Sequence, residues 1–121
     1  MIVIIAGSRH GRPEHELYDA IRESGLDITE IVHGGASGVD AQADKLAREK
    51  DIPVTIFRAA WVALGPAAGP IRNRHMAEYA AADPEGGALI ALDGGDGTAS
   101  MIREARKAGL KVWIHPGTPK E

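Results

Sequence analysis

The sequence predicts an α/β fold, a Rossmann-like three-layer sandwich with a mostly parallel sheet of about five strands. Short apolar runs typical of buried strands alternate along the chain with longer runs that have helical spacing. Strands that alternate with helices imply right-handed crossovers and therefore a parallel sheet covered on both faces. The length of 121 residues is that of one domain.

The first half of the chain contains three predicted strands and two predicted helices. Residues 2–6 are continuously apolar, as expected for a strand with both faces covered. A helix from about Glu14 to Ser24 places Leu17 and Ile21 on one face and ends at Gly25. We further expect a strand over 28–33, a helix over 37–50 and a strand over 53–57.

The second half begins with a stretch rich in Ala and Gly, residues 58–69, which we expect to be irregular. Pro70 suits the first position of a helix that runs to about Ala82. The predicted domain covers residues 1–114, and the tail 115–121 is predicted to be flexible. The other elements expected here are a strand over 88–92, a helix over 98–108 closed by Gly109, and a strand over 110–114.

Composition excludes several classes of function. The net charge of -3 argues against broad binding to a nucleic-acid backbone, so a nucleic-acid partner is not expected. The chain has no cysteine, which excludes disulfides and thiolate chemistry. Its five histidines lack metal-ligand spacing, so we predict neither a metal nor another cofactor. No run has signal-peptide or membrane-span length, and we expect a cytoplasmic protein without a membrane partner.

Four polar or glycine-rich segments lie near the predicted ends of strands or starts of helices. In doubly wound folds, ligands bind beyond the carboxyl ends of the strands, so these segments are the predicted ligand site. The candidate binding residues are Gly7, Ser8, Arg9, Gly34, Gly35, Gly38, Asp40, Arg72, Asn73, Gly94, Gly95, Gly97 and Thr98.

Two of the segments contain a Gly-Gly pair before a predicted helix. Glycine allows backbone N–H groups to approach a ligand closely, and the helix N-terminus adds its positive dipole end. Thr98 is a candidate N-cap that also presents a hydroxyl to phosphate, and Ser37 is a similar candidate. The simpler alternative is a pair of tight turns. Two such segments in one small domain, with arginines at other predicted strand ends, favour an anion site.

The charged residues have more than one interpretation. Arg9 and Arg72 are the candidate phosphate partners, because arginine binds phosphate through paired donors. Asp40 either complements a helix dipole or accepts hydrogen bonds from ribose. Asp93 and Asp96 would repel a bare phosphate, so ribose contact, a metal or solvation must account for them.

Two other side chains have a favoured structural interpretation. Arg74 is interpreted as a solvated residue near a helix end. Trp61 either stacks on a nucleobase or packs in the core, and core packing is favoured for an isolated Trp in an Ala-rich segment.

Together these segments resemble the SLOG superfamily, which includes the DNA-processing protein DprA (Smf) and the LOG-type "lysine decarboxylase-like" proteins. The most similar part is its YspA/YpsA-related group, DUF2493. The resemblance implies a Rossmann-like fold, a nucleotide pocket and a homodimer. It rests, in order along nearly the whole chain, on Gly7-Ser8-Arg9, on His33-Gly34-Gly35 with Gly38 and Asp40, on Ala68-Gly69-Pro70 with Arg72-Asn73-Arg74 and Met76, and on Gly94-Gly95 with Gly97-Thr98.

The sequence departs from the LOG enzymes, which cleave the N-glycosidic bond of cytokinin nucleotides. Their Pro-Gly-Gly-x-Gly-Thr loop is followed closely by a glutamate, and an arginine lies on the preceding helix. Here Arg72 matches that arginine, but Asp93 replaces the proline and Ala99 to Met101 supply no acid. The next acid, Glu104, is about two turns along the helix, and we expect it to point away from the loop.

The leading hypothesis is a sensor or carrier domain that binds a nucleotide or an ADP-ribose-like phosphate ligand. The first alternative is an enzyme, a nucleotide N-glycosidase or phosphoribohydrolase, with Asp93, Asp96 and Arg72 as catalytic candidates. The second is single-stranded DNA binding in the manner of DprA, which the acidic balance and the lack of an aromatic platform disfavour.

Overall fold

The computed structural model describes residues 1–115, and within them the predicted fold class is confirmed. Five strands form one sheet in the order β3-β2-β1-β4-β5, and every neighbouring pair is parallel. The strands are β1 (Ile2–Ala6), β2 (Glu30–His33), β3 (Val54–Ile56), β4 (Gly87–Leu92) and β5 (Lys111–His115).

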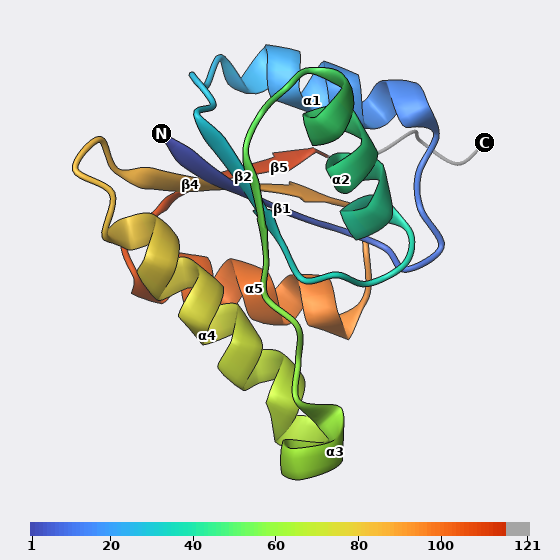
Figure 1. Ribbon diagram of the computed structural model, residues 1–121, viewed down its shortest axis with the longest axis vertical. Helices are drawn as coiled ribbons and strands as arrows, with labels where there is room; N and C mark the ends of the chain where they lie inside the picture. Colours follow the sequence, from blue (N-terminus) through green and yellow to red (C-terminus); the bar gives the residue numbers. More distant parts are fainter. Residues whose placement is uncertain (116–121) are drawn as a thin grey trace.

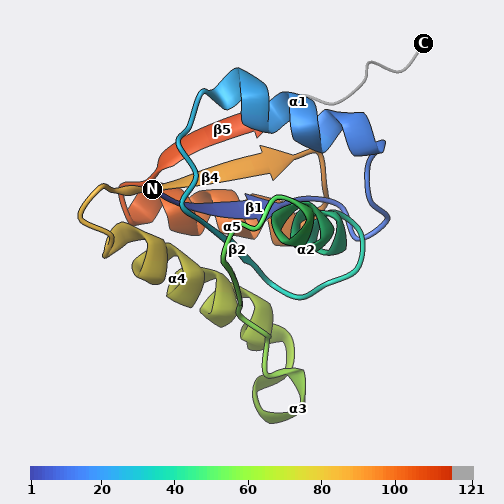
Figure 2. The same ribbon diagram turned by 45° about the horizontal axis from the view of Figure 1, so that its top comes forward.

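Helices cover both faces of the sheet, which gives three layers. Figures 1 and 2 show α1 and α2 on one side and α4 and α5 on the other, with α3 projecting at the far end of α4. The helices are α1 (Glu14–Ser24), α2 (Val39–Glu49), α3 (Trp61–Leu64), the 3-10 helix η1 (Gly65–Ala67), α4 (Ala68–Ala81) and α5 (Asp96–Lys107).

The core has two halves, one on each face, because successive side chains of a strand point to opposite faces. Val3 and Ile5 of β1 pack with α1 and α2, whereas Ile4 packs with α4 and α5. All six residues of β4 are buried. This double burial explains why the central strands read as continuous apolar runs.

Several predicted boundaries differ from the structure. The stretch expected to be irregular contains α3 and η1, and α4 begins two residues before Pro70. Pro70 still lies in the first turn, where its missing N–H has no helical partner to lose. His115 is the last residue of β5 rather than part of a tail, because its backbone pairs with Leu92. The rest of the predicted tail, 116–121, lies outside the described residues.

The strand order places the chain reversal between β1 and β4. From β1 the chain continues to α1 on one face of the sheet, and from β4 to α5 on the other. The loops after these two neighbouring strands therefore diverge and leave a crevice at the carboxyl edge. Within residues 1–115, none of the helices combines the length and the apolar character needed to span a bilayer.

Candidate functional site

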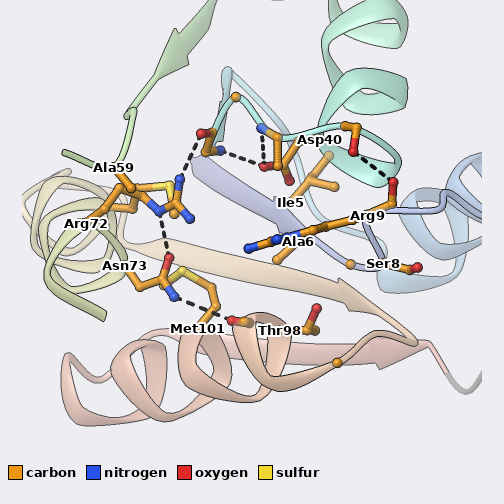
Figure 3. Close-up of a pocket in the computed structure, with 18 of the residues that line it drawn as sticks. Ile5, Ala6, Ser8, Arg9, Asp40, Ala59, Arg72, Asn73, Thr98 and Met101 are labelled. Atoms are coloured by element: carbon orange, nitrogen blue, oxygen red, sulfur yellow. Dashed lines mark hydrogen bonds between the residues drawn. The ribbon is translucent and has the colours of Figure 1, made fainter. Parts of the chain in front are cut away.

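A cleft of about 820 Å³ lies at this carboxyl edge, beside the ends of β1 and β4. Figure 3 shows its polar side chains, which come from the loops after β1 and β2, from α2, from α4 and from the start of α5. The apolar side chains of Ile5, Met76 and Met101 also line it. The predicted binding residues that line the cleft are Gly7, Ser8, Arg9, Gly34, Gly35, Asp40, Arg72, Asn73, Gly95, Gly97 and Thr98.

At the first Gly-Gly segment, the loop after β1 covers the helix N-terminus. The Val39 N–H at the start of α2 donates to the Ser8 carbonyl oxygen at 3.0 Å, and the Ser37 hydroxyl donates to the Arg9 carbonyl oxygen at 2.9 Å. Gly38, not Ser37, is the N-cap; its φ is +74°, and a side chain there would collide with the backbone of Ser8 and Arg9. Gly38 therefore lets the loop after β1 cover the start of α2, and it is not among the cleft-lining residues.

The second Gly-Gly segment does present an open helix N-terminus. Gly95 is the N-cap of α5, and no side chain among residues 1–115 caps this helix. The N–H groups of Asp96, Gly97 and Thr98 have no partner along the helix, and all three residues line the cleft. The positive end of the α5 dipole is thus available to an anion.

Thr98 is not the N-cap that the sequence predicts, because α5 begins two residues earlier and makes it the third helical residue. Its hydroxyl lies where a side chain on Gly94 would be. Such a Cβ would also be 2.9 Å from the Ser8 nitrogen and 3.0 Å from the Gly7 carbonyl carbon. Gly94 therefore allows the loops after β1 and β4 to pack together, and it does not itself line the cleft.

Arg72 projects from α4 and joins that helix to two strand ends. Its Nη1 donates to the carbonyl oxygens of Gly34 at 2.8 Å and Phe57 at 3.1 Å, and its Nε donates to Asn73 Oδ1 at 2.9 Å. These acceptors are all neutral, so the hydrogen bonds orient the guanidinium without neutralising its charge.

Arg9 reaches toward Arg72 across the cleft, as Figure 3 shows. Burial is the main cause that lowers the pKa of Arg72, and the charge of Arg9 lowers it further, whereas Asp40 raises it. An arginine stays protonated despite such shifts, so Arg9 and Arg72 are two positive charges that repel each other across the cleft, while the Asp40 carboxylate attracts Arg72. An anion bound between them would relieve this repulsion.

Asp40 lies in the first turn of α2 and is 9% exposed. Its Oδ2 accepts hydrogen bonds from the N–H groups of Gly34 and Ala36, both at 3.1 Å. Burial raises the pKa of this carboxyl, while the Ala36 N–H, the side chains of His33 and Arg72, and the Gly34 N–H oppose the shift. Asp40 thus shapes the loop after β2, a role that the sequence did not indicate, and its two suggested roles stay predictions.

His33 at the end of β2 is held in one tautomer. Its Nδ1 accepts the Gly35 N–H at 3.0 Å, so that nitrogen carries no proton. In the neutral ring the proton is therefore on Nε2, which lies 2.9 Å from Asp44 Oδ1. The hydrogen bond to Arg48 and then that to His33 lower the pKa of Asp44. Through the hydrogen bond from Gly35, His33 holds the Gly34-Gly35 turn in place, and it does not line the cleft.

Asn73 connects α4 to α5 and is 4% exposed. Its Nδ2 donates to Ser100 Oγ at 3.2 Å and to the Gly97 carbonyl oxygen at 3.4 Å, while its Oδ1 accepts from Arg72. These contacts fix the start of α5 relative to Arg72. The side chain predicted to bind ligand thus has internal partners at both polar atoms.

The two carboxylates proposed as catalytic candidates have different positions. Asp96 is exposed and lines the cleft at the first position of α5. Asp93 is exposed but is not a lining residue, and its charge acts on Arg12, just before α1. Of the catalytic candidates, Asp96 and Arg72 are therefore the two that line the cleft.

Two residues that line the cleft, Arg58 and Trp61, are not among the binding residues predicted from the sequence. Both belong to the connection after β3, and Arg58 Nη1 is 3.5 Å from the Gly35 carbonyl oxygen. The core position favoured for Trp61 is wrong, because this side chain is 48% exposed. The signal that could have found them is position: both follow a predicted strand end, where ligand-binding residues gather.

The residues described, 1–115, contain no group of three or more His, Asp or Glu side chains arranged to hold a metal. No family model matches the sequence. The chain is 35% identical over 125 residues to the "Gene 61 protein" of Mycobacterium phage D29, in an alignment that covers 91% of this chain and 92% of the relative.

Proposed function

We propose that this chain, which belongs to the family of the Gene 61 protein of Mycobacterium phage D29, binds a nucleotide or nucleotide-derived ligand through its phosphate. One observation carries the proposal. Arg9 and Arg72 converge on a cleft that also receives the uncapped N-terminus of α5. Two guanidinium groups and a helix N-terminus provide the donors and the positive charge that a phosphate requires.

The size and lining of the cleft support a ligand larger than inorganic phosphate. Its volume of about 820 Å³ is within the range of small-molecule and cofactor pockets. Ile5, Met76 and Met101 add apolar surface beside the charged groups. A nucleotide combines a phosphate with a less polar base in the same way. The resemblance to the SLOG superfamily agrees with this class of ligand and stays a prediction.

The proposed role is that of a sensor or carrier domain rather than an enzyme. LOG-type hydrolysis uses a glutamate soon after the glycine-rich loop, and this chain has no acid at that place. Asp40 already accepts two backbone N–H groups, so Asp96 is the more available carboxylate among the lining residues described. A cleft in which one of the two lining carboxylates is already engaged by backbone N–H groups fits binding better than turnover.

A thermal-shift screen tests the proposal with AMP, ADP, NAD, ADP-ribose, ribose 5-phosphate and inorganic phosphate. A ligand at about 100 times its Kd adds about 2.7 kcal/mol to the free energy of unfolding, which is several degrees in Tm. The shift should shrink in Arg9→Ala and in Thr98→Val, since both side chains line the cleft. Arg9 is exposed, so its removal leaves the core intact.

Arg74→Ala is the matched control, because Arg74 is an exposed arginine on α4 that pairs with Glu78 and does not line the cleft. Its ligand shift should equal that of the wild type. An equal loss of the ligand shift in Arg9→Ala and Arg74→Ala would show that the shift depends on overall charge, and it would contradict the site.

A homodimer stays a prediction as well, and sedimentation velocity with and without nucleotide measures it.

A further inference from the structure

We infer that Trp61 forms an aromatic subsite on which the base of the bound nucleotide stacks. The inference rests on the proposed function, because it assigns one part of the same cleft to one part of the ligand. Trp61 lines the cleft from α3. Figure 1 shows α3 beyond the N-terminal end of α4, away from the sheet.

The exposure of Trp61 is the first supporting observation. Its side chain is 48% exposed although tryptophan usually buries a large apolar area. Leaving that area in water forgoes stabilisation that burial would give. The chain contains one other tryptophan, Trp113 on β5, which is 38% exposed and does not line the cleft. Trp61 therefore combines exposure with a position beside the ligand site.

The contact between Trp61 and Gly69 is the second observation. A Cβ on Gly69 would lie 3.0 Å from Cη2 of the indole and within 4 Å of Cζ2 and Cζ3. The six-membered ring is thus supported by the first turn of α4, where Ala68 and Gly69 are buried. A ring that is supported on one side loses little conformational entropy when a ligand stacks on it.

The other groups of the cleft define the class of ligand. Arg9, Arg72 and the start of α5 supply an anion site, and Trp61 supplies an aromatic surface in the same cleft. A ligand that uses both has a planar aromatic ring joined to a phosphate through a short spacer, as in a nucleoside monophosphate. Stacking on one aromatic side chain tolerates any base, so this contact favours nucleotides over sugar phosphates.

Calorimetric titration with AMP and with ribose 5-phosphate separates the two parts of the site, since AMP carries adenine where ribose 5-phosphate carries a hydroxyl group. We expect the wild type to bind AMP about tenfold more tightly than ribose 5-phosphate, the affinity that stacking typically adds. Trp61→Leu should lower the AMP affinity to about that of ribose 5-phosphate and leave the sugar phosphate unchanged. Trp113→Leu, the matched control, should alter neither.

A fluorescence titration gives a second readout that does not require removal of the ring. In Trp113→Phe the emission comes from Trp61, and AMP should quench it whereas ribose 5-phosphate should not. Gly69→Ala places a methyl group against the indole, so it should reduce the preference for AMP while keeping ribose 5-phosphate binding.

Each contrary result has a separate meaning. Equal affinity of the wild type for both ligands, or an equal loss of both in Trp61→Leu, overturns the base subsite and leaves the phosphate site in place. Unquenched Trp61 fluorescence at saturating AMP also overturns the subsite. If neither ligand binds the wild type, the base subsite fails; if none of the other nucleotides of the thermal-shift screen binds, the proposed function fails as well.

Discussion

The Nη1 atom of Arg72 donates to the carbonyl oxygen of Gly34 at 2.8 Å, and the same guanidinium occupies the space that a side chain on residue 34 would need. Arg72 lies on α4, and Gly34 directly follows β2. Because Gly34 has no side chain, Arg72 can approach closely enough to make this hydrogen bond. This contact ties a helix on one face of the sheet to the loop that leads to the opposite face.

Gly34→Ala should displace Arg72 and weaken nucleotide binding, because the new Cβ would collide with Nη1 and Cζ of the guanidinium. The hydrogen bonds to Gly34 and Phe57 would then be strained or lost, with a cost in stability of about 1–3 kcal/mol. Urea denaturation measures the cost, and thermal shift with AMP measures the binding.

A double-mutant cycle tests the cause. In an Arg72→Ala background the Gly34→Ala change should cost much less, because its collision partner is gone. Additive costs would contradict the pairing. For stability, Gly97→Ala is the control for adding a methyl group, since a Cβ on Gly97 would have no atom of residues 1–115 outside its own stretch of helix within 4 Å, and alanine favours a helix.

Gly95→Val should abolish phosphate binding with little effect on the fold. Apart from its chain neighbours, no described atom lies within 4 Å of a Cβ at this N-cap, so the side chain is accommodated in the ligand-free protein. Gly95 lines the cleft, however, and a branched side chain there would block the approach of phosphate to the start of α5. Circular dichroism and Tm check the fold, and wild-type affinity in this variant would mean that the ligand lies elsewhere.

The stability of Asp40→Asn relative to the wild type should depend on pH. Burial raises the pKa of Asp40, so the folded protein binds this proton more tightly than the unfolded chain. As the pH falls from 7 through the raised pKa toward the ordinary aspartate value of about 3.9, the wild type should gain stability relative to Asp40→Asn. Urea denaturation across this range measures the difference, and a difference that stays constant or reverses would contradict the assignment.

Asp40→Ala should be more costly than Asp40→Asn at every pH. Alanine removes the oxygen that accepts the N–H groups of Gly34 and Ala36, whereas asparagine retains one acceptor oxygen. Two unsatisfied N–H groups cost about 2–4 kcal/mol in a buried site. Equal stability of the two variants would show that these hydrogen bonds do not hold the loop.

Asp96→Asn should strengthen phosphate binding, because it removes a negative charge from the cleft wall at the first position of α5. The gain should be about two- to fivefold at low ionic strength and smaller at high ionic strength. Stability should fall by about 0.3–1 kcal/mol, since the carboxylate complements the helix dipole. Calorimetry at two salt concentrations measures the first effect, and thermal unfolding the second.

The same variant separates binding from hydrolysis. Chromatography of AMP incubated with the wild type would detect released adenine. If the wild type releases the base and Asp96→Asn binds AMP but releases none, the N-glycosidase alternative replaces the binding role. Intact AMP with both proteins supports the binding role.

The predicted elements agree with the structure where a single local signal, such as continuous burial or a terminating glycine, marks their ends. β1 and α1 have the bounds that we expect, because continuous burial marks the strand and Gly25, with φ +66°, ends the helix. The predicted start of α5 is two residues too late. Threonine is a common N-cap, so the sequence favours Thr98, whereas the N-cap in the structure is Gly95, which has no capping side chain. The short α3 is not predicted, since four residues are too few to show a period.

The fold class and a set of residues that mostly line the cleft follow from the sequence, because alternating buried strands and helices imply a parallel sheet with the glycine-rich loops at one edge. Which of the two helix N-terminal ends a ligand can reach depends on tertiary contacts. The two Gly-Gly segments look alike in sequence, but the loop after β1 covers the start of α2 and leaves the start of α5 uncovered. The position of Trp61 at the cleft is likewise a result of tertiary contacts. These outcomes depend on contacts between residues far apart in the chain, which local pattern does not encode.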